Sequence, residues 1–283
     1  MKKKLSNLMI ILIFIAGLSL LVYPLVANKW NNYRQEKLIQ NYQQALIKKE
    51  ETIDYENEIQ KAKVYNQALT PHVLPDSFAN ARNSKIKDQT YLSALNLTGD
   101  GMMGIIEIPK INVKLPIYHT TSKKVLEKAA GHLEGSSLPI GGKGNHVVIS
   151  AHRGLPSASL FTDLDQLKKG NHFLIHVLNK TLCYQVDRIE VVKPEETSSL
   201  KIKQGKDYVS LLTCTPYGIN DKRLIVRGHR VAYSEKKIQN EEKNNSSSMH
   251  TRYGLWVLVG LSVTSVFIFG LYRKDKRMKA KVL

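Results

Sequence analysis

The chain has 283 residues, of which 42% are hydrophobic and 23% are charged. This length and composition suit one medium domain with accessory segments and exclude wholesale disorder. The formal net charge is +18 at pH 7, so a nucleic-acid partner has to be considered. Nine basic residues and one acid lie in the two terminal tails, which leaves about +10 on the rest of the chain. A basic surface of this kind favours anionic polymers or lipid headgroups, and we expect no nucleic-acid partner.

Two apolar segments predict membrane-spanning helices. Leu5 to Asn28 and Tyr253 to Tyr272 contain no charged residue, and each is close to the ~20 residues that a helix needs to cross a bilayer. Three lysines precede the first segment and six basic residues follow the second, so the positive-inside rule places both ends in the cytoplasm. The segment from Lys29 to Arg252 is then extracytoplasmic.

Each span has an alternative interpretation. The first resembles a cleaved signal peptide, because Leu25-Val26-Ala27 loosely fits a cleavage site; we favour a retained span, since Leu25 is not small and the apolar run is long. A buried core helix is the alternative for the second span, and the basic tail that follows it argues against that interpretation.

The region between the first span and residue 100 predicts helices followed by a loop. Apolar residues such as Leu38, Tyr42 and Leu46 recur at helical spacing between Trp30 and Leu69, which indicates one or two amphipathic helices. Pro71 and Pro75 end this pattern. The polar stretch that follows, Asp76 to Asp100, shows no strand pattern.

From Gly104 onward the pattern is that of β-strands separated by turn residues. The expected strands are Gly104–Ile108, Val113–Tyr118, His146–Ala151, His172–Leu178, Thr181–Val192, Tyr208–Thr213 and Arg223–Tyr233. Short helices fit Ser122–Ala130 and Leu160–Lys168. The fold class that follows is mainly β, a closed and mainly antiparallel β-barrel with short helical insertions, N-terminal helices and two flanking transmembrane helices.

After Tyr233 the sequence becomes polar, and we expect a flexible linker without a binding role. The predicted organisation has five parts. They are a cytoplasmic tail and first span (1–28), a helical region with a loop (29–100), the β-barrel (101–234), a polar linker (235–252), and the second span with a basic cytoplasmic tail (253–283).

Three residues at predicted strand ends suggest thiol chemistry. Cys214 ends an apolar strand just before a Pro/Gly turn, and a reactive thiolate needs a nearby cation to lower its pKa. Arg223 opens the next strand and can supply that charge. His152 follows another apolar strand and offers the imidazole that a cysteine nucleophile uses as acid and base.

Residue spacing alone leaves these assignments open. Cys214 and Cys183 are the two cysteines, and a structural disulfide between them is the simplest interpretation for an exported protein. His132 is a rival base, and Arg227 and Arg230 are rival cations whose simplest role is on a solvated strand face.

Three longer motifs resemble those of a known family. The first is Thr213-Cys214-Thr215-Pro216-Tyr217-Gly218, which continues to Arg223-Leu224-Ile225-Val226-Arg227-Gly228. The others are Gly131-His132-Leu133-Glu134-Gly135-Ser136-Ser137-Leu138-Pro139 and Ile149-Ser150-Ala151-His152-Arg153-Gly154-Leu155-Pro156. Between Gly104 and Tyr233 the chain closely resembles sortases, specifically the pilus-assembling class C.

This resemblance implies roles for individual residues. Cys214, His152 and Arg223 correspond to the catalytic triad, and His132 is structural. Cys214 then has to stay free, so the disulfide with Cys183 is not expected, and Cys183 is a small buried apolar residue.

The resemblance also implies an activity. In such enzymes the cysteine thiolate cleaves the Thr–Gly bond of an LPXTG-like sorting signal, and a lysine of the next pilin resolves the thioacyl enzyme as an isopeptide bond. No metal or organic cofactor is implied. The expected partners are pilin or surface proteins and the membrane, for a monomeric enzyme. Attachment of surface proteins to a cell-wall amine and a non-catalytic surface receptor are the alternatives.

One segment before the barrel resembles the lid that class C sortases carry over their active site. The family motif is Asp-Pro-aromatic, and the corresponding residues here are Leu74-Pro75-Asp76-Ser77-Phe78. Asp76 and Phe78 are therefore the lid candidates. Ser77 stands where the family has proline, and because serine lacks the fixed φ of proline we expect a more mobile lid.

Overall fold

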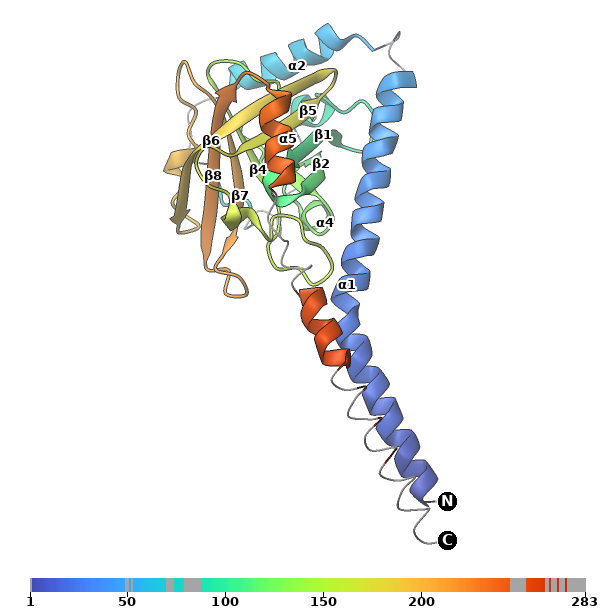
Figure 1. The fold of residues 1–283 in the computed structure, drawn as a ribbon. Helices are drawn as coiled ribbons and strands as arrows, with labels where there is room; N and C mark the ends of the chain where they lie inside the picture. Colours follow the sequence, from blue (N-terminus) through green and yellow to red (C-terminus); the bar gives the residue numbers. More distant parts are fainter. Residues whose placement is uncertain are drawn as a thin grey trace, which may run out of the picture.

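The computed structural model describes residues 2–48, 51, 53–69, 74–78, 88–244 and 253–262, together with 265, 269 and 273. Its centre is an eight-stranded closed barrel in the order β1-β2-β3-β4-β7-β8-β6-β5 (Figure 1). The strands are β1 Met102–Ile108, β2 Val113–His119, β3 Ala130–His132, β4 Asn145–Ser150, β5 His172–Val177, β6 Lys180–Val192, β7 Asp207–Thr215 and β8 Lys222–Val231. The mainly β barrel fold expected from the sequence is confirmed.

Most strand pairs are antiparallel, as the sequence pattern predicts. Two pairs are parallel: β2 with β3, and β4 with β7. The second pair matters for function, because β4 precedes His152 and β7 contains Cys214. Parallel neighbours end at the same edge of a sheet, so the residues that follow β4 meet those at the end of β7.

The barrel interior is filled by side chains from alternate strand positions. Phe173 of β5 and Tyr184 of β6 are fully buried and stack with their ring centroids 5.7 Å apart. Gly228 of β8 lies against this stack, where an added Cβ would stand 2.7 Å from the Phe173 ring. Glycine is therefore required for β8 to pass the aromatic pair.

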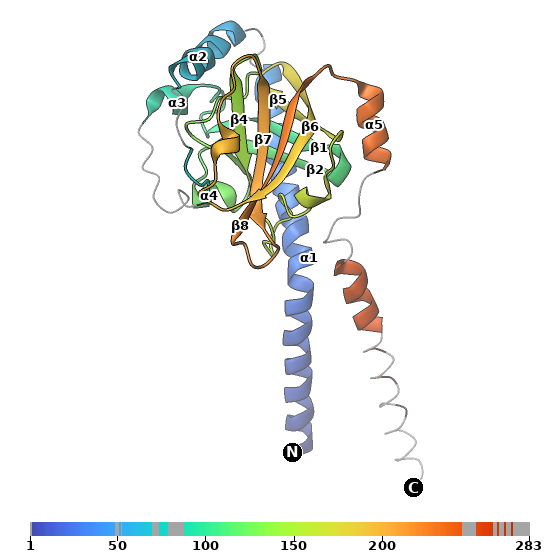
Figure 2. The same ribbon diagram turned by 90° about the vertical axis from the view of Figure 1, so that its left-hand side faces the viewer.

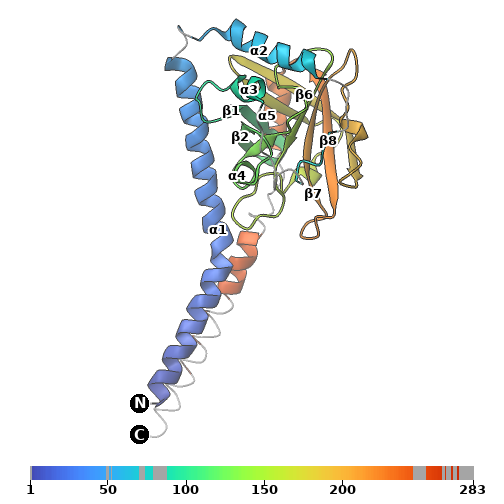
Figure 3. The same cartoon turned by 180° about the vertical axis from the view of Figure 1, so that it is seen from behind.

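Helices cover one side and one end of the barrel. The long helix α1 (Lys2–Lys48) runs beside β2 and projects beyond the barrel, whereas α2 (Tyr55–Ala68) crosses the opposite end (Figures 1 and 3). Asp54 caps α2 by accepting a hydrogen bond from the Asn57 amide at 2.9 Å. The short helix α3 (Gln89–Ser93) follows and contributes the fully buried Tyr91 to the core.

Three local expectations differ from the structure. The helices expected at Ser122–Ala130 and Leu160–Lys168 shorten to α4 (Lys123–Leu126) and one 3₁₀ turn (Leu164–Gln166). Strand β3 was not expected at all. The first half of the expected flexible linker is helix α5 (Glu235–Lys243), which packs beside the barrel (Figure 2).

Helix α5 is held by one apolar and one polar contact. Ile238 is buried against Leu174 and Cys183. The Glu241 carboxylate accepts hydrogen bonds from the backbone amide of His172 at 3.1 Å and pairs with its Nδ1 at 2.7 Å. The expectation of an unstructured tether after Tyr233 is therefore wrong for residues 235–243.

The two membrane spans stay predictions. The first, Leu5–Asn28, falls within α1, and of the second, Tyr253–Tyr272, the structure describes residues 253–262, 265 and 269. In the part of the chain that the structure describes, no helix reaches the length and apolarity needed to cross a bilayer. The described start of the second segment lies beside α1, because the Tyr253 hydroxyl donates to the Leu21 carbonyl at 3.1 Å.

Candidate active site

Cys214 and Arg223 face each other across the β7–β8 ladder. They are direct register partners, and each is 8% exposed. The loop between them, residues 216–221, turns at the end of the barrel from which α1 projects (Figure 2). The Ile219 and Asn220 amides both donate to the Pro216 carbonyl, so the turn closes on itself. The sheet thus sets the backbone separation of the two residues, and Arg223 Nη1 donates to the Asn220 and Lys222 carbonyls at 3.1 and 3.0 Å.

His152 reaches the same end of the barrel through the parallel pair β4–β7. Ser150 is the register partner of Leu212, so His152 and Cys214 each lie two residues beyond a paired position. The Ala151 amide donates to the Leu212 carbonyl at 3.2 Å, and the Thr213 hydroxyl donates to the Ala151 carbonyl at 2.7 Å. The three residues singled out in the sequence are therefore brought together at one rim.

The segment 74–78 lies over this rim. The Asp76 carboxylate accepts two hydrogen bonds from Arg223, from Nε and from Nη2, each at 2.8 Å. The Phe78 ring lies 5.3 Å from the His152 ring and 5.2 Å from the Arg223 guanidinium carbon. The acid and the aromatic ring of the predicted lid thus contact two of the three candidate catalytic residues.

Two further contacts anchor the segment. The Thr197 hydroxyl donates to the Leu74 carbonyl at 2.7 Å. Ser77 is fully buried, and its hydroxyl accepts a hydrogen bond from the Ser150 hydroxyl at 2.8 Å. Serine in place of the family's proline was expected to leave this loop more mobile, and here its side chain makes a buried contact to the strand that leads to His152.

Burial disfavours the charged forms of both Cys214 and His152 in the resting site. It raises the pKa of the Cys214 thiol, an effect that Arg223 opposes and Asp76 reinforces. It lowers the pKa of His152, an effect that Glu127 opposes. Near neutral pH the site therefore holds a thiol and a neutral imidazole, because both shifts disfavour the charged forms.

One residue of the site escaped the sequence analysis. Arg153 is 8% exposed, donates from Nη1 to the Thr215 hydroxyl at 3.0 Å and forms an ion pair with Asp165. It thereby ties the loop after His152 to the end of the nucleophile strand. Its position directly after His152 was the available signal.

The rival residues lie elsewhere in other roles. His132 is fully buried, its Nε2 contacts the Ser137 carbonyl at 2.8 Å, and burial lowers its pKa to about 3. Arg227 makes two hydrogen bonds to Asp187, at 2.9 and 3.0 Å. Cys183 and Cys214 are both free thiols.

Comparisons with known proteins agree with this geometry. A family model described as a sortase domain matches residues 106–231. Sortase D of Bacillus subtilis is 31% identical over 160 residues, which cover 56% of this chain and 77% of that protein. The chain belongs to the sortase family. It is therefore a cysteine transpeptidase.

Solved sortases share the fold. A sortase C from Streptococcus pneumoniae is 40% identical and superposes with a TM-score of 0.63, covering 70% of this chain and 98% of that one. Sortase C1 from Streptococcus agalactiae is 46% identical with a TM-score of 0.60, covering 70% of this chain and 100% of that one. The structural neighbours of this sortase are thus class C enzymes.

Proposed function

We propose that this sortase polymerises pilins, with Cys214 as nucleophile, His152 as acid and base, and Arg223 as the cation that binds substrate and the developing oxyanion. The observation that carries the proposal is the pairing of Cys214 with Arg223 at the rim where β4 also delivers His152. Class C neighbours, one of them described as pilus-related, support the choice of substrate.

The chemistry follows from the resting state of the site. His152 takes the proton of the Cys214 thiol, and the thiolate adds to the Thr–Gly carbonyl carbon of an LPXTG-like signal. The imidazolium then gives this proton to the departing amine as the C–N bond breaks, which leaves a thioacyl enzyme. Arg223 stabilises the oxyanion, a contact of a kind worth roughly 2.7–4 kcal/mol.

The second half-reaction reverses these roles. A lysine amine of the next pilin loses its proton to His152 and adds to the thioester carbonyl. The isopeptide bond forms as the C–S bond breaks, and Cys214 recovers its proton from the imidazolium.

We further propose that Asp76 and Phe78 form a lid that competes with substrate. Asp76 occupies the Arg223 guanidinium, and Phe78 covers the His152 ring. A site open ~1% of the time would show a ~100-fold weaker apparent affinity. The free enzyme is therefore partly self-blocked.

We also propose that the barrel is extracytoplasmic and anchored by two spans. Basic residues precede the first apolar segment and follow the second, which places both ends of the chain in the cytoplasm. The start of the second segment also contacts α1.

The deciding experiment incubates the full chain with a pilin that carries an LPXTG-like signal. Wild-type enzyme should give a covalent ladder, and Cys214→Ala should give neither cleavage nor ladder. Cys183→Ala is the matched control and should leave both largely intact. The assignment fails if Cys183→Ala is as damaging as Cys214→Ala while the domain stays folded.

A second arm of this experiment tests the substrate. Supplying a wall-precursor amine in place of the pilin lysine separates pilin polymerisation from wall attachment. Faster resolution of the thioacyl enzyme by that amine than by pilin would favour the attachment function.

A further inference from the structure

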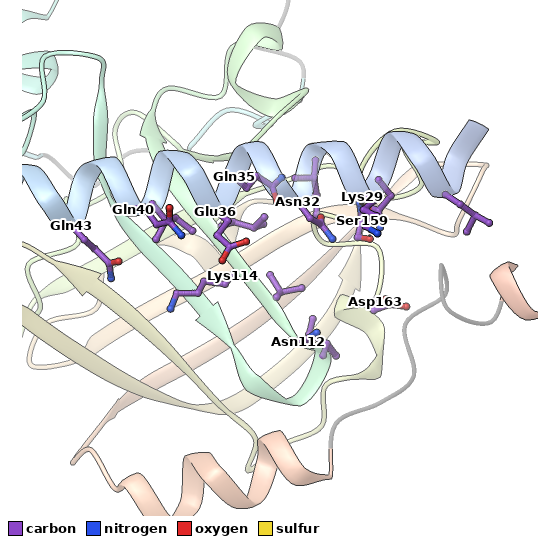
Figure 4. A pocket seen from close by; sticks show the side chains of 17 residues that line it. Lys29, Asn32, Gln35, Glu36, Gln40, Gln43, Asn112, Lys114, Ser159 and Asp163 are labelled. Atoms are coloured by element: carbon purple, nitrogen blue, oxygen red, sulfur yellow. Dashed lines mark hydrogen bonds between the residues drawn. The ribbon is translucent and has the colours of Figure 1, made fainter. Parts of the chain in front are cut away.

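The loop that follows His152 is hydrogen-bonded to helix α1. The Asn28 Oδ1 atom accepts hydrogen bonds from the Ser159 amide at 2.8 Å and from the Ser159 hydroxyl at 2.9 Å. One turn further along α1, the Asn31 Nδ2 atom donates to the Ser157 carbonyl at 2.5 Å. Figure 4 shows Ser159 against the side of α1, next to Lys29 and Asn32.

These contacts are connected to His152 by a backbone hydrogen bond within the same loop. Two residues after Ser159, the Phe161 amide donates to the carbonyl of His152 itself at 3.1 Å. The Gly154 amide donates to the Thr162 hydroxyl at 3.1 Å, which closes the loop at its base. Phe161 is fully buried, so a displacement at Ser159 passes to the His152 backbone instead of being absorbed.

A third hydrogen bond joins α1 to the turn after α4. Gln35 of α1 is 5% exposed and donates from Nε2 to the Lys128 carbonyl at 3.0 Å. Lys128 directly follows Glu127, whose charge acts on His152. One face of α1 therefore contacts both the loop that follows His152 and the turn that carries Glu127.

The apolar packing of α1 on the barrel lies further along the helix, where Ile39 and Tyr42 are buried with Met102 and Tyr118. A groove of about 710 Å³ separates α1 from β2 beside the contacts, and many of its lining side chains are polar, among them Asn32, Gln40 and Gln43 (Figure 4). At the loop itself, α1 is joined by the hydrogen bonds of Asn28 and Asn31.

We propose that Asn28 and Asn31 are positioning residues for His152, so that the helix predicted to leave the membrane fixes the acid–base group of the reaction. The proposal rests on the proposed catalytic role of His152.

Asn28 accepts hydrogen bonds whereas Asn31 donates one, so substitution by aspartate should affect the two positions differently. Asn28 accepts from an amide and a hydroxyl, so Asn28→Asp keeps its function and Asn28→Ala removes it. Asn31 donates to a carbonyl, so Asn31→Asp loses the bond and places a carboxylate against an oxygen. Asn32→Ala is the control, because Asn32 lies on the same helix and makes no hydrogen bond to the described residues.

The measurement is steady-state cleavage of a sorting-signal peptide by the full chain in detergent. We expect Asn28→Ala and Asn31→Asp to lower kcat about tenfold with KM changed less than twofold, because misplacing a catalytic group costs turnover rather than ground-state binding. Asn28→Asp and Asn32→Ala should match wild type. Thiol labelling of Cys214 should be equal in all variants, because the sheet positions that residue.

The outcomes separate the two hypotheses. Equal kcat for Asn28→Ala and Asn32→Ala overturns the positioning role, and so does a loss of thermal stability in Asn28→Ala that Asn28→Asp does not restore. If His152→Ala itself keeps full activity, the proposed catalytic role fails instead.

Discussion

Asp76 affects the candidate nucleophile in two ways. It occupies the Arg223 guanidinium, and its negative charge raises the pKa of Cys214. Asp76→Asn removes the charge with little change of shape. The substitution frees the Arg223 guanidinium and removes a negative charge near the thiol, and both changes stabilise the thiolate. The pKa of Cys214 should therefore fall, and its labelling should extend to lower pH.

The measurement is the rate of iodoacetamide labelling of Cys214 against pH in the Cys183→Ala background. At neutral pH, Asp76→Asn should label several-fold faster than the parent, since a fall of one pKa unit raises a small thiolate fraction about tenfold. Asp187→Asn is a matched control, because Asp187 pairs with Arg227 away from the site. Superimposable profiles would show that the carboxylate is not part of a lid.

Ser77 is the second residue whose role in the lid can be measured. Its buried hydroxyl accepts from Ser150, and Ser77→Ala leaves that donor without its partner. Losing such a bond costs about 0.5–1.5 kcal/mol, which should shift the lid toward its open state. Cleavage of a peptide signal should rise in Ser77→Ala, and also in the variant with Ala at both Asp76 and Phe78. Lower or unchanged cleavage in both variants would contradict the lid.

The candidate site shows what residue patterns can and cannot predict. Cys214 and His152 were recognisable because each ends an apolar strand, and the long motifs selected Arg223 over Arg227. The contact between Asn28 and Ser159 joins residues 131 positions apart, and no local pattern encodes it. The same holds for the bond between Ser77 and Ser150, which are 73 positions apart.

At the level of elements, the alternation of apolar and polar residues predicted the bounds of the seven longer strands to within about two residues. It missed β3, because three residues are too few to show a period and Gly131 carries no side chain. It also missed that β4 and β7 are parallel, because strand direction depends on partners distant in sequence. Helix α5 escaped because its sequence is polar except for Ile238.

Helix α5 leads to a prediction at this scale. Ile238 covers Cys183, which is 1% exposed. Ile238→Ala should loosen α5, because such truncations cost about 2–5 kcal/mol and a short helix depends on its tertiary packing for stability. In a Cys214→Ala background, Cys183 of the folded protein should then react with a thiol reagent much faster.

The control for α5 is Ile219→Ala, since Ile219 is 70% exposed and lies in the β7–β8 loop. It should leave Cys183 unreactive. Equal protection of Cys183 in Ile238→Ala and in the parent would mean that the barrel alone buries the thiol.

For the whole molecule, α1 continues without interruption from the predicted span into the part that contacts the barrel. In wall-stripped cells, external protease should digest the segment from Lys29 to Arg252 and spare both tails. A tag placed after Leu283 should become accessible only after the membrane is permeabilised. Detection of that tag on intact cells would contradict the two-span topology.

The pairing of Cys214 with Arg223 on adjacent strands also bears on how such an enzyme can diversify. Both residues are held by the ladder, whereas the six residues between their strands, 216–221, are exposed and closed by their own hydrogen bonds. The Asn220 carbonyl of this loop also accepts a hydrogen bond from Arg223 Nη1 at 3.1 Å, so a replacement loop has to keep an acceptor at that position. Within that constraint the exposed side chains of the loop can change, and with them the substrate preference, while the ladder keeps Cys214 and Arg223 in register.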